Sequence, residues 1–262
     1  MTINLIQPKH PWSGVQLGCT TRWGGVGRAP YDNFNLGLGS GEDMQTVLDN
    51  RALLRALLPS DPCWLKQVHG CEVVDADEAA LSAERYFPPE VDACVTQTPG
   101  RVLAILTADC LPVVLADRDG QVLGAAHAGW RGLAAGVLEQ TLRAMQTKYP
   151  QARGWQAWIG PGIGAKSFQV GQDVRDAFEE HGADQPGMFV RDPADAQKWL
   201  ADLAGLAVWR LKRAGVEQVE NSGLCTVSDP EKRFFSYRRD RQTGRMATLA
   251  WLVPSSVVDK LI

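Results

Sequence analysis

The middle of the chain consists of short apolar runs separated by turn residues, a pattern that predicts β-strands. Strands are predicted at residues 15–21, 63–68, 71–74, 91–96, 102–106, 113–115, 122–126, 155–159, 216–220 and 247–253. Apolar residues at helical spacing predict helices over residues 43–58, 133–148, 172–181 and 194–214. Because the strands crowd the middle and the helices fall late, the pattern indicates an α+β fold with mixed sheets. No linker-like stretch divides residues 1–262, so we expect a single domain.

Arg51 interrupts the apolar stripe of the first predicted helix. An arginine on an apolar face needs a partner, such as a carboxylate or a bound anion. Alternatively, its aliphatic stem lies along the apolar surface and its charged end reaches water. The sequence leaves both interpretations open.

The composition is that of an ordinary globular protein. The 262 residues are 45% hydrophobic and 22% charged, which excludes a disordered or collagen-like chain. Lys and Arg (27) against Asp and Glu (30) give 27 − 30 = −3, and no long basic run appears. We therefore expect neither a nucleic-acid surface nor a membrane surface. The most apolar stretch, residues 102–116, is cut by Asp109 and Pro112 and is too short to span a bilayer.

The first residues show no basic region followed by an apolar core, so no signal peptide is expected. The six cysteines are scattered without Cys-x-x-Cys pairs, which favours reduced thiols and a cytoplasmic location.

The glycine-rich loop of residues 160–167 is similar to a phosphate-binding loop, but Ala165 stands where that loop needs glycine. A nucleotide loop also requires a helix to begin there, and the following residues look extended. We expect a structural turn.

Three predicted strands are followed or ended by a metal ligand or nucleophile, in segments that contain His69, Cys110 and His127. The separations, 110 − 69 = 41 and 127 − 110 = 17, are too wide for a zinc finger. They suit a site that folding assembles at the ends of neighbouring strands. Two imidazoles and one thiolate leave a fourth position open, as in a catalytic zinc site.

Other interpretations of these residues stay open. Each could be a separate core or surface residue, and Cys63, His69 and Cys71 form a rival local cluster, although residue 63 should point elsewhere. Two histidines and a cysteine also suit blue copper, but four histidines are too few for a blue site plus a trinuclear cluster. A cysteine hydrolase would use Cys110 with His127 as its base.

Further motifs accompany these three segments along nearly the whole chain: Gly24-Gly-Val, Pro30-Tyr31, Asn35-Leu-Gly, Asn50-Arg51, Gln67-Val-His-Gly, Thr107-Ala-Asp-Cys-Leu-Pro, His127-Ala-Gly-Trp-Arg-Gly, Ile159-Gly-Pro-Gly-Ile-Gly, Cys225-Thr226, Phe235-Ser-Tyr-Arg-Arg-Asp240 and Thr243-Gly-Arg245. Together they resemble the laccase-domain family, whose members are also called multicopper polyphenol oxidases, peptidoglycan editing factors and FAMIN-type purine nucleoside phosphorylases.

This resemblance implies zinc bound by His69, Cys110 and His127, with copper as the other possible metal. It implies phosphorolysis of adenosine, inosine, guanosine and S-methyl-5′-thioadenosine, with adenosine deamination as a second activity. The implied fold is an α/β/β/α sandwich similar to the catalytic domain of the cytotoxic necrotizing factors. The implied partners are a nucleoside and phosphate, and the chain would be a monomer or a small homo-oligomer.

Several residues are candidates for the remaining roles. Arg51 could clamp phosphate with its planar fork, and the helix start at Arg131 is a second candidate anion site. Asp109 could orient a ligand histidine or act as an acid or base, and we favour orientation. Phe235 could stack a purine or belong to the core, and Arg238 lies in a basic cluster with Arg239 and Arg245 that could bind substrate or face solvent.

The alternative functions are a Cys–His hydrolase that edits peptidoglycan precursors, a copper-dependent polyphenol oxidase, and a metal-binding protein without turnover.

Overall fold

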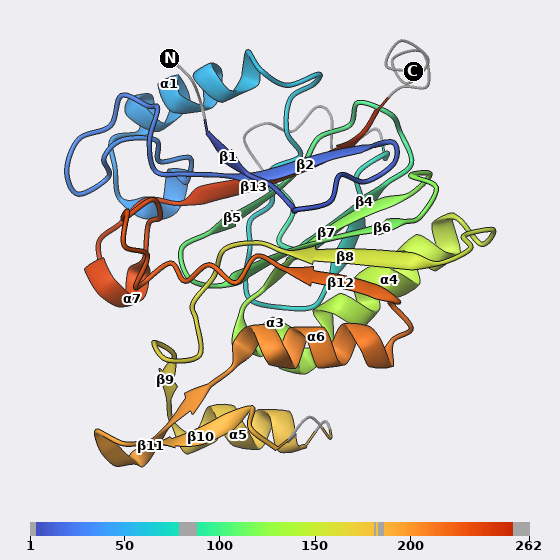
Figure 1. The fold of residues 1–262 in the computed structure, drawn as a ribbon. Coiled ribbons are helices and arrows are strands. Elements are labelled where there is room, and N and C mark those ends of the chain that lie inside the picture. Colours follow the sequence, from blue (N-terminus) through green and yellow to red (C-terminus); the bar gives the residue numbers. More distant parts are fainter. Residues whose placement is uncertain (1–3, 79–87, 181, 183–185, 254–262) are drawn as a thin grey trace.

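The structure is a computed structural model that describes residues 4–78, 88–180, 182 and 186–253. Two β-sheets stack face to face, and helices cover their outer faces (Figure 1). Three clusters of buried apolar side chains fill the three spaces between these four layers. The layer order is therefore α/β/β/α with mixed sheets, as the sequence analysis expected.

A four-stranded antiparallel sheet forms one inner layer. Its order is β1 (Leu5–Ile6), β2 (Val15–Thr20), β13 (Met246–Leu252) and β5 (Leu103–Thr107). Helix α1 (Met44–Arg55) covers its outer face, where Leu54 packs with Ala104 and Leu249. The helix begins where predicted, because the carboxylate of Asp43 accepts a hydrogen bond from the backbone N–H of Thr46.

A six-stranded mixed sheet forms the other inner layer. Its order is β12 (Gln218–Asn221), β8 (Trp155–Ile159), β6 (Leu111–Asp117), β7 (Leu123–Ala128), β4 (Ala93–Thr96) and β3 (Val73–Asp75). The two outermost pairs are parallel and the others antiparallel. Its inner face meets the first sheet around Val114 and Trp158, which are fully buried.

Three helices cover the outer face of the six-stranded sheet: α3 (Trp130–Ala135), α4 (Val137–Lys148) and α6 (Leu203–Arg213). The prediction of one helix over residues 133–148 was wrong, because Gly136 separates two helices. Its φ of 98° lies in the left-handed region, which ends α3 and redirects the chain into α4.

The prediction of a helix over residues 194–214 was wrong in its first half. Residues 195–201 form strand β11 (Asp195–Ala201), in which Trp199 and Ala201 are buried at a spacing of two. The helix begins only after Asp202, whose carboxylate accepts a hydrogen bond from the N–H of Gly205. Strand β11 forms a small separate sheet with β10 (Phe189–Asp192) and β9 (Gln169–Val170).

The remaining helices and strands agree only in part with the predictions from the sequence. Helix α5 (Gln172–Glu179) lies where one was predicted, although His181 falls outside the described residues. The predicted strand over residues 63–68 is irregular, with a single bridge from Cys63 to Leu103. The short elements β1, β10, η1 (Leu38–Ser40) and α7 (Tyr237–Asp240) were not predicted, whereas β9 lies in the residues after 167 that were expected to be extended.

All six cysteines lie in the described part of the chain, and each is a free thiol. Within that same part, no helix is long and apolar enough to cross a membrane.

Candidate metal centre

The fold brings His69, Cys110 and His127 together. One ligand atom from each lies within 4.8 Å of those of the other two, and Cys110 Sγ is 3.9 Å from His69 Nε2. Cys110 directly precedes β6, and the pairing of Leu111 with Ala128 brings it beside His127 in the neighbouring strand β7. His69 reaches the same point from the loop before β3. Strand pairing therefore brings Cys110 to His127, whereas His69 arrives from a loop and not from the strand end that the sequence predicted.

Backbone strain marks two positions at this centre. His69 has a φ of 64° and Asp109, the residue before Cys110, has a φ of 102°. Residues other than glycine seldom adopt the left-handed region, and such positions cluster at functional sites. Here the strained positions are a candidate ligand and the direct neighbour of another.

Asp92, which the sequence analysis missed, binds both histidine segments. Its Oδ1 accepts hydrogen bonds from His127 Nδ1 at 2.7 Å and from the His69 N–H at 2.9 Å. Its Oδ2 accepts from the N–H groups of Gly70 at 2.7 Å and Val68 at 3.1 Å. Asp92 is fully buried, so this single carboxylate fixes the loop that carries His69 and leaves His127 Nε2 to face the centre.

Cys110 and His127 each stabilise the charged form of the other. Burial raises the pKa of the Cys110 thiol, but the charge of His127 and hydrogen bonds from both histidines outweigh it and lower the pKa to about 6. Burial lowers the pKa of His127, but the Cys110 thiolate and Asp92 raise it to about 9. The metal-free protein therefore holds a thiolate–imidazolium pair, and binding a metal would release the imidazolium proton.

Gly129 leaves the space in which a metal would be held. A Cβ at this position would lie 2.8 Å from His69 Cδ2 and 3.1 Å from Cys110 Sγ, inside van der Waals contact. Gly132 allows the first turn of α3 to touch the ligand loop, because a Cβ there would lie 2.5 Å from the carbonyl oxygen of Gly70. The glycines of the segment that follows His127 thus serve the centre and not only the start of a helix.

The donor set fits a zinc ion. Zinc bonds of about 2.0–2.3 Å to nitrogen and sulfur in a tetrahedron place neighbouring ligand atoms roughly 3–4 Å apart, close to the 3.9 Å between Cys110 and His69. His69 is exposed and His127 is buried, so the cluster is accessible from the side of His69.

Asp109 does not contact either histidine, contrary to our expectation that it orients one. Its carboxylate accepts hydrogen bonds from Thr226 Oγ1 and from the backbone N–H of Arg238, both at 2.6 Å. Its carbonyl oxygen accepts from the N–H of Ile163 at 2.7 Å. Asp109 therefore ties two loops and the first turn of α7 to the backbone beside Cys110, and Asp92 holds the histidine. The loop of residues 160–167 forms the expected turn, and no helix begins there.

Three further residues predicted to bind substrate differ in how accessible they are. Arg131 is exposed in the first turn of α3, with its guanidinium 4.3 Å from the centre of the Trp130 ring. The Arg238 guanidinium donates to the carbonyl oxygen of Gln169 at 2.9 Å. Phe235 is fully buried in the core between the sheets, so it is unavailable to stack on a purine. Tyr237, two residues further, is 52% exposed.

The Arg51 side chain and the Arg245 backbone both contact the backbone of Leu36, whereas Arg245 Nη1 donates to the carbonyl oxygens of Thr243 and Gly244, both at 2.9 Å. Arg51 Nε donates to the Leu36 carbonyl oxygen at 2.9 Å, and the Leu36 N–H donates to the Arg245 carbonyl oxygen at 3.1 Å. Burial lowers the pKa of Arg51 to about 10, and its guanidinium stacks 3.9 Å from the centre of the Trp64 ring. Neither arginine forms an ion pair with a carboxylate of the described residues.

Arg245 lies within electrostatic range of the candidate centre. Burial lowers its pKa, and the charges of Cys110 and Asp109 oppose that shift. Its stem passes over Gly37, where a Cβ would lie 2.6 Å from Arg245 Cγ. The sequence placed Arg245 only in a basic cluster, and its distance from Cys110 along the chain hid this relation.

The family model described as multi-copper polyphenol oxidoreductase laccase matches residues 16–253. The chain is 44% identical over 252 residues to purine nucleoside phosphorylase YfiH of Escherichia coli, covering 95% of this chain and 99% of that protein. It is 49% identical over 257 residues to a purine nucleoside phosphorylase of Xylella fastidiosa, covering 95% and 96%.

Solved structures show the same fold. Protein NMB0706 of Neisseria meningitidis superposes with a TM-score of 0.85 at 41% identity, covering 96% of this chain and 100% of that one. YlmD of Geobacillus stearothermophilus superposes with a TM-score of 0.83 at 28% identity, covering 97% and 100%.

Proposed function

Because the chain belongs to the multi-copper polyphenol oxidoreductase laccase family, and its relatives at 44% and 49% identity are named purine nucleoside phosphorylases, we propose that it is a zinc-dependent purine nucleoside phosphorylase. Its substrates are adenosine, inosine, guanosine and S-methyl-5′-thioadenosine, with adenosine deamination as a side activity. The observation that carries this proposal is the open-sided cluster of His69, Cys110 and His127, with Asp92 behind it.

Phosphorolysis requires an inorganic phosphate held against C1′ of the ribose and a purine that departs with a proton. When bound, zinc would supply Lewis-acid chemistry that polarises a phosphate, substrate or water oxygen. The protein supplies position: Asp92 holds the ligand loop, and Gly129 keeps the space open.

Two half-buried arginines without carboxylate partners in the described chain suit the phosphate. Arg51 Nε donates to the Leu36 carbonyl oxygen, and Arg245 Nη1 donates to the carbonyl oxygens of Thr243 and Gly244. The pKa of Arg245 responds to the charge of Cys110, so this arginine is near the candidate centre. A guanidinium fork matches phosphate oxygens and strengthens as water leaves. Arg131 adds a third, exposed positive charge beside the helix that follows His127. Tyr237, rather than Phe235, offers an exposed ring for the purine.

A Cys–His hydrolase is the second candidate. The observation in its favour is the thiolate–imidazolium pair, since a Cys110 pKa of about 6 provides a nucleophile at neutral pH. That reaction needs no metal, whereas the proposed phosphorylase does. Removal of metal therefore separates the two.

The test is product analysis with adenosine, with and without inorganic phosphate. The proposal expects adenine and ribose 1-phosphate in equal amounts, no adenine without phosphate, and no turnover after chelation. Free ribose formed without phosphate would contradict it. Inosine formed from adenosine in the absence of phosphate would report the deaminase activity separately.

A further inference from the structure

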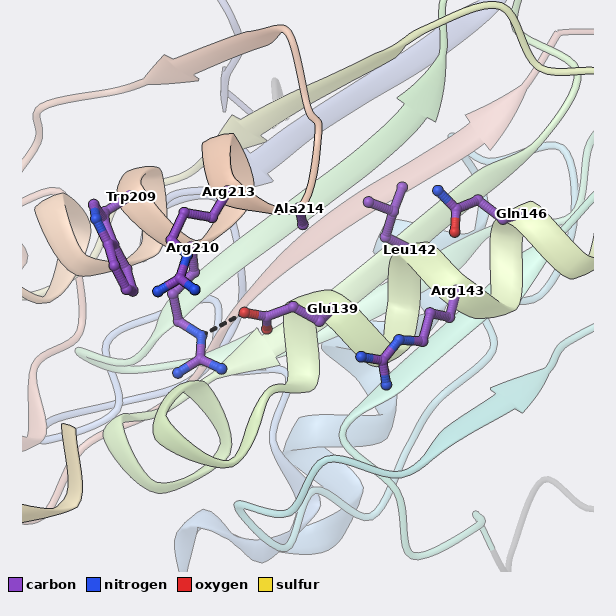
Figure 2. Close-up of a pocket in the computed structure, with 8 residues that line it drawn as sticks. All are labelled: Glu139, Leu142, Arg143, Gln146, Trp209, Arg210, Arg213 and Ala214. Atoms are coloured by element: carbon purple, nitrogen blue, oxygen red, sulfur yellow. Dashed lines mark hydrogen bonds and ion pairs between the residues drawn. The ribbon is translucent and has the colours of Figure 1, made fainter. Parts of the chain in front are cut away.

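A groove of about 350 Å³ lies between α4 and α6, on the outer helical layer (Figure 2). Figure 2 shows Trp209 at one end of the groove and Gln146 at the other, with arginine side chains and Glu139 between them. None of these residues belongs to the candidate metal centre. The groove therefore requires its own explanation.

Arg210 is the fixed element of the groove. Only 8% of this residue is exposed, its Nε donates to Glu139 Oε1 at 2.7 Å, and its Nη1 donates to the carbonyl oxygen of Ala134 at 3.1 Å. These bonds immobilise the guanidinium, and within the described chain Nη2 has no hydrogen-bond partner. A buried arginine held by two bonds presents a preformed donor at low entropic cost.

Two more guanidinium groups lie at the same groove. Arg143 on α4 and Arg213 on α6 are both exposed, and no carboxylate among residues 4–78, 88–180 and 186–253 forms an ion pair with either. Arg213 lies over the ring of Trp209, 4.6 Å from its centre, which orders its head group at the groove. Three arginines against one glutamate leave a local charge of 3 − 1 = +2, in a chain whose net charge is −3.

We propose that this groove is a second binding site, for a small phosphorylated anion. Arg210 supplies a fixed donor, and Arg143 and Arg213 close on the phosphate oxygens from the two helices. Arginine is suited to this role because its planar fork bonds two phosphate oxygens at once. The groove is large enough for a pyrophosphate or a sugar phosphate, and Glu139 is its one carboxylate, so we assign it binding and no reaction.

The position of Arg210 joins this site to the candidate centre. Its Nη1 holds the carbonyl of Ala134 in the last turn of α3, and α3 begins three residues after His127. An anion that draws on Arg210 would thereby act on the helix that packs against the ligand loop.

The test is titration calorimetry of the zinc-loaded protein with pyrophosphate at low salt. The test variant is the double replacement Arg143→Ala/Arg213→Ala, which leaves the Arg210–Glu139 pair intact. The matched control is Lys212→Ala, which removes one positive charge from the same helix but whose Nζ donates to the Glu217 carbonyl oxygen, away from the groove.

We expect one pyrophosphate-binding event to weaken at least about tenfold in the double variant and to persist in Lys212→Ala. The proposal would be overturned if the wild-type protein did not bind pyrophosphate. It would also be overturned if the pyrophosphate Kd of the double variant were within twofold of the wild-type value. A weakening of the same size in Lys212→Ala would also overturn it, because the effect would then come from net charge alone. Far-ultraviolet circular dichroism and thermal unfolding check that both variants fold.

Discussion

Replacing Asp92 with asparagine removes one charge and almost no volume from a fully buried position. Each carboxylate oxygen accepts two hydrogen bonds, from His127 and His69 on one side and from Gly70 and Val68 on the other. An amide has only one accepting oxygen, so in either orientation its NH₂ group faces two donors.

At least two charge-assisted hydrogen bonds are thereby lost. At about 1.5–3 kcal/mol each, the free energy of unfolding should fall by roughly 3 kcal/mol or more. Support of a metal-bound histidine by a carboxylate is typically worth 10–100-fold in metal affinity, which is about 1.4–2.7 kcal/mol. Asp92→Asn should therefore raise the zinc Kd by roughly 10–100-fold.

The assay is competition for zinc against a chromophoric chelator, together with urea unfolding of the metal-free protein. Asp117→Asn is the matched control, since Asp117 is fully buried at the other end of β6 and accepts from Gln121 and Val122 N–H groups in a turn. It should lose less stability, because a single amide oxygen can still accept both of these hydrogen bonds, and it should keep its zinc affinity. A zinc Kd within twofold of wild type in Asp92→Asn would refute the assigned role of Asp92.

Three other substitutions test separate parts of the site. Gly129→Ala should fold but lose zinc at equimolar metal, because its Cβ would lie 2.8 Å from His69; full zinc content would contradict this. Arg245→Ala should raise the KM for phosphate at least about tenfold and change kcat less, and an unchanged KM would remove Arg245 from the phosphate site. Tyr237→Ala should raise the nucleoside KM with little loss of stability, whereas Phe235→Ala should cost about 3–5 kcal/mol of stability as a core cavity. Equal stability losses in these last two variants would contradict the placement of the rings.

The three candidate metal ligands could be predicted from the sequence because each one lies next to a recognisable local pattern. His69, Cys110 and His127 each adjoin an apolar run, and short runs of this kind predict strands whose ends meet. Asp92 carries no such signal. It adjoins a strand like many other aspartates, and its partners become visible only once β4 pairs with β7 and the 68–70 loop returns to that edge.

The wrong predictions of secondary structure have similar causes. A single glycine such as Gly136 barely changes the spacing of apolar residues by which a helix is predicted. Its left-handed backbone nevertheless separates α3 from α4. In residues 195–201, pairing with β10 decides for strand over helix, and that pairing is long-range information. For Phe235 the sequence left purine stacking and core packing open, and only the packing of the two sheets decides for the core.

In our proposal, one metal bound by His69, Cys110 and His127 supports phosphorolysis. The most direct test is to titrate zinc into the metal-free protein while following phosphate-dependent release of adenine from adenosine. Activity should rise linearly, reach a plateau at one equivalent of zinc per chain, and be absent at every zinc level in Cys110→Ala. Full activity before zinc is added, or the same titration curve in Cys110→Ala, would contradict the claim.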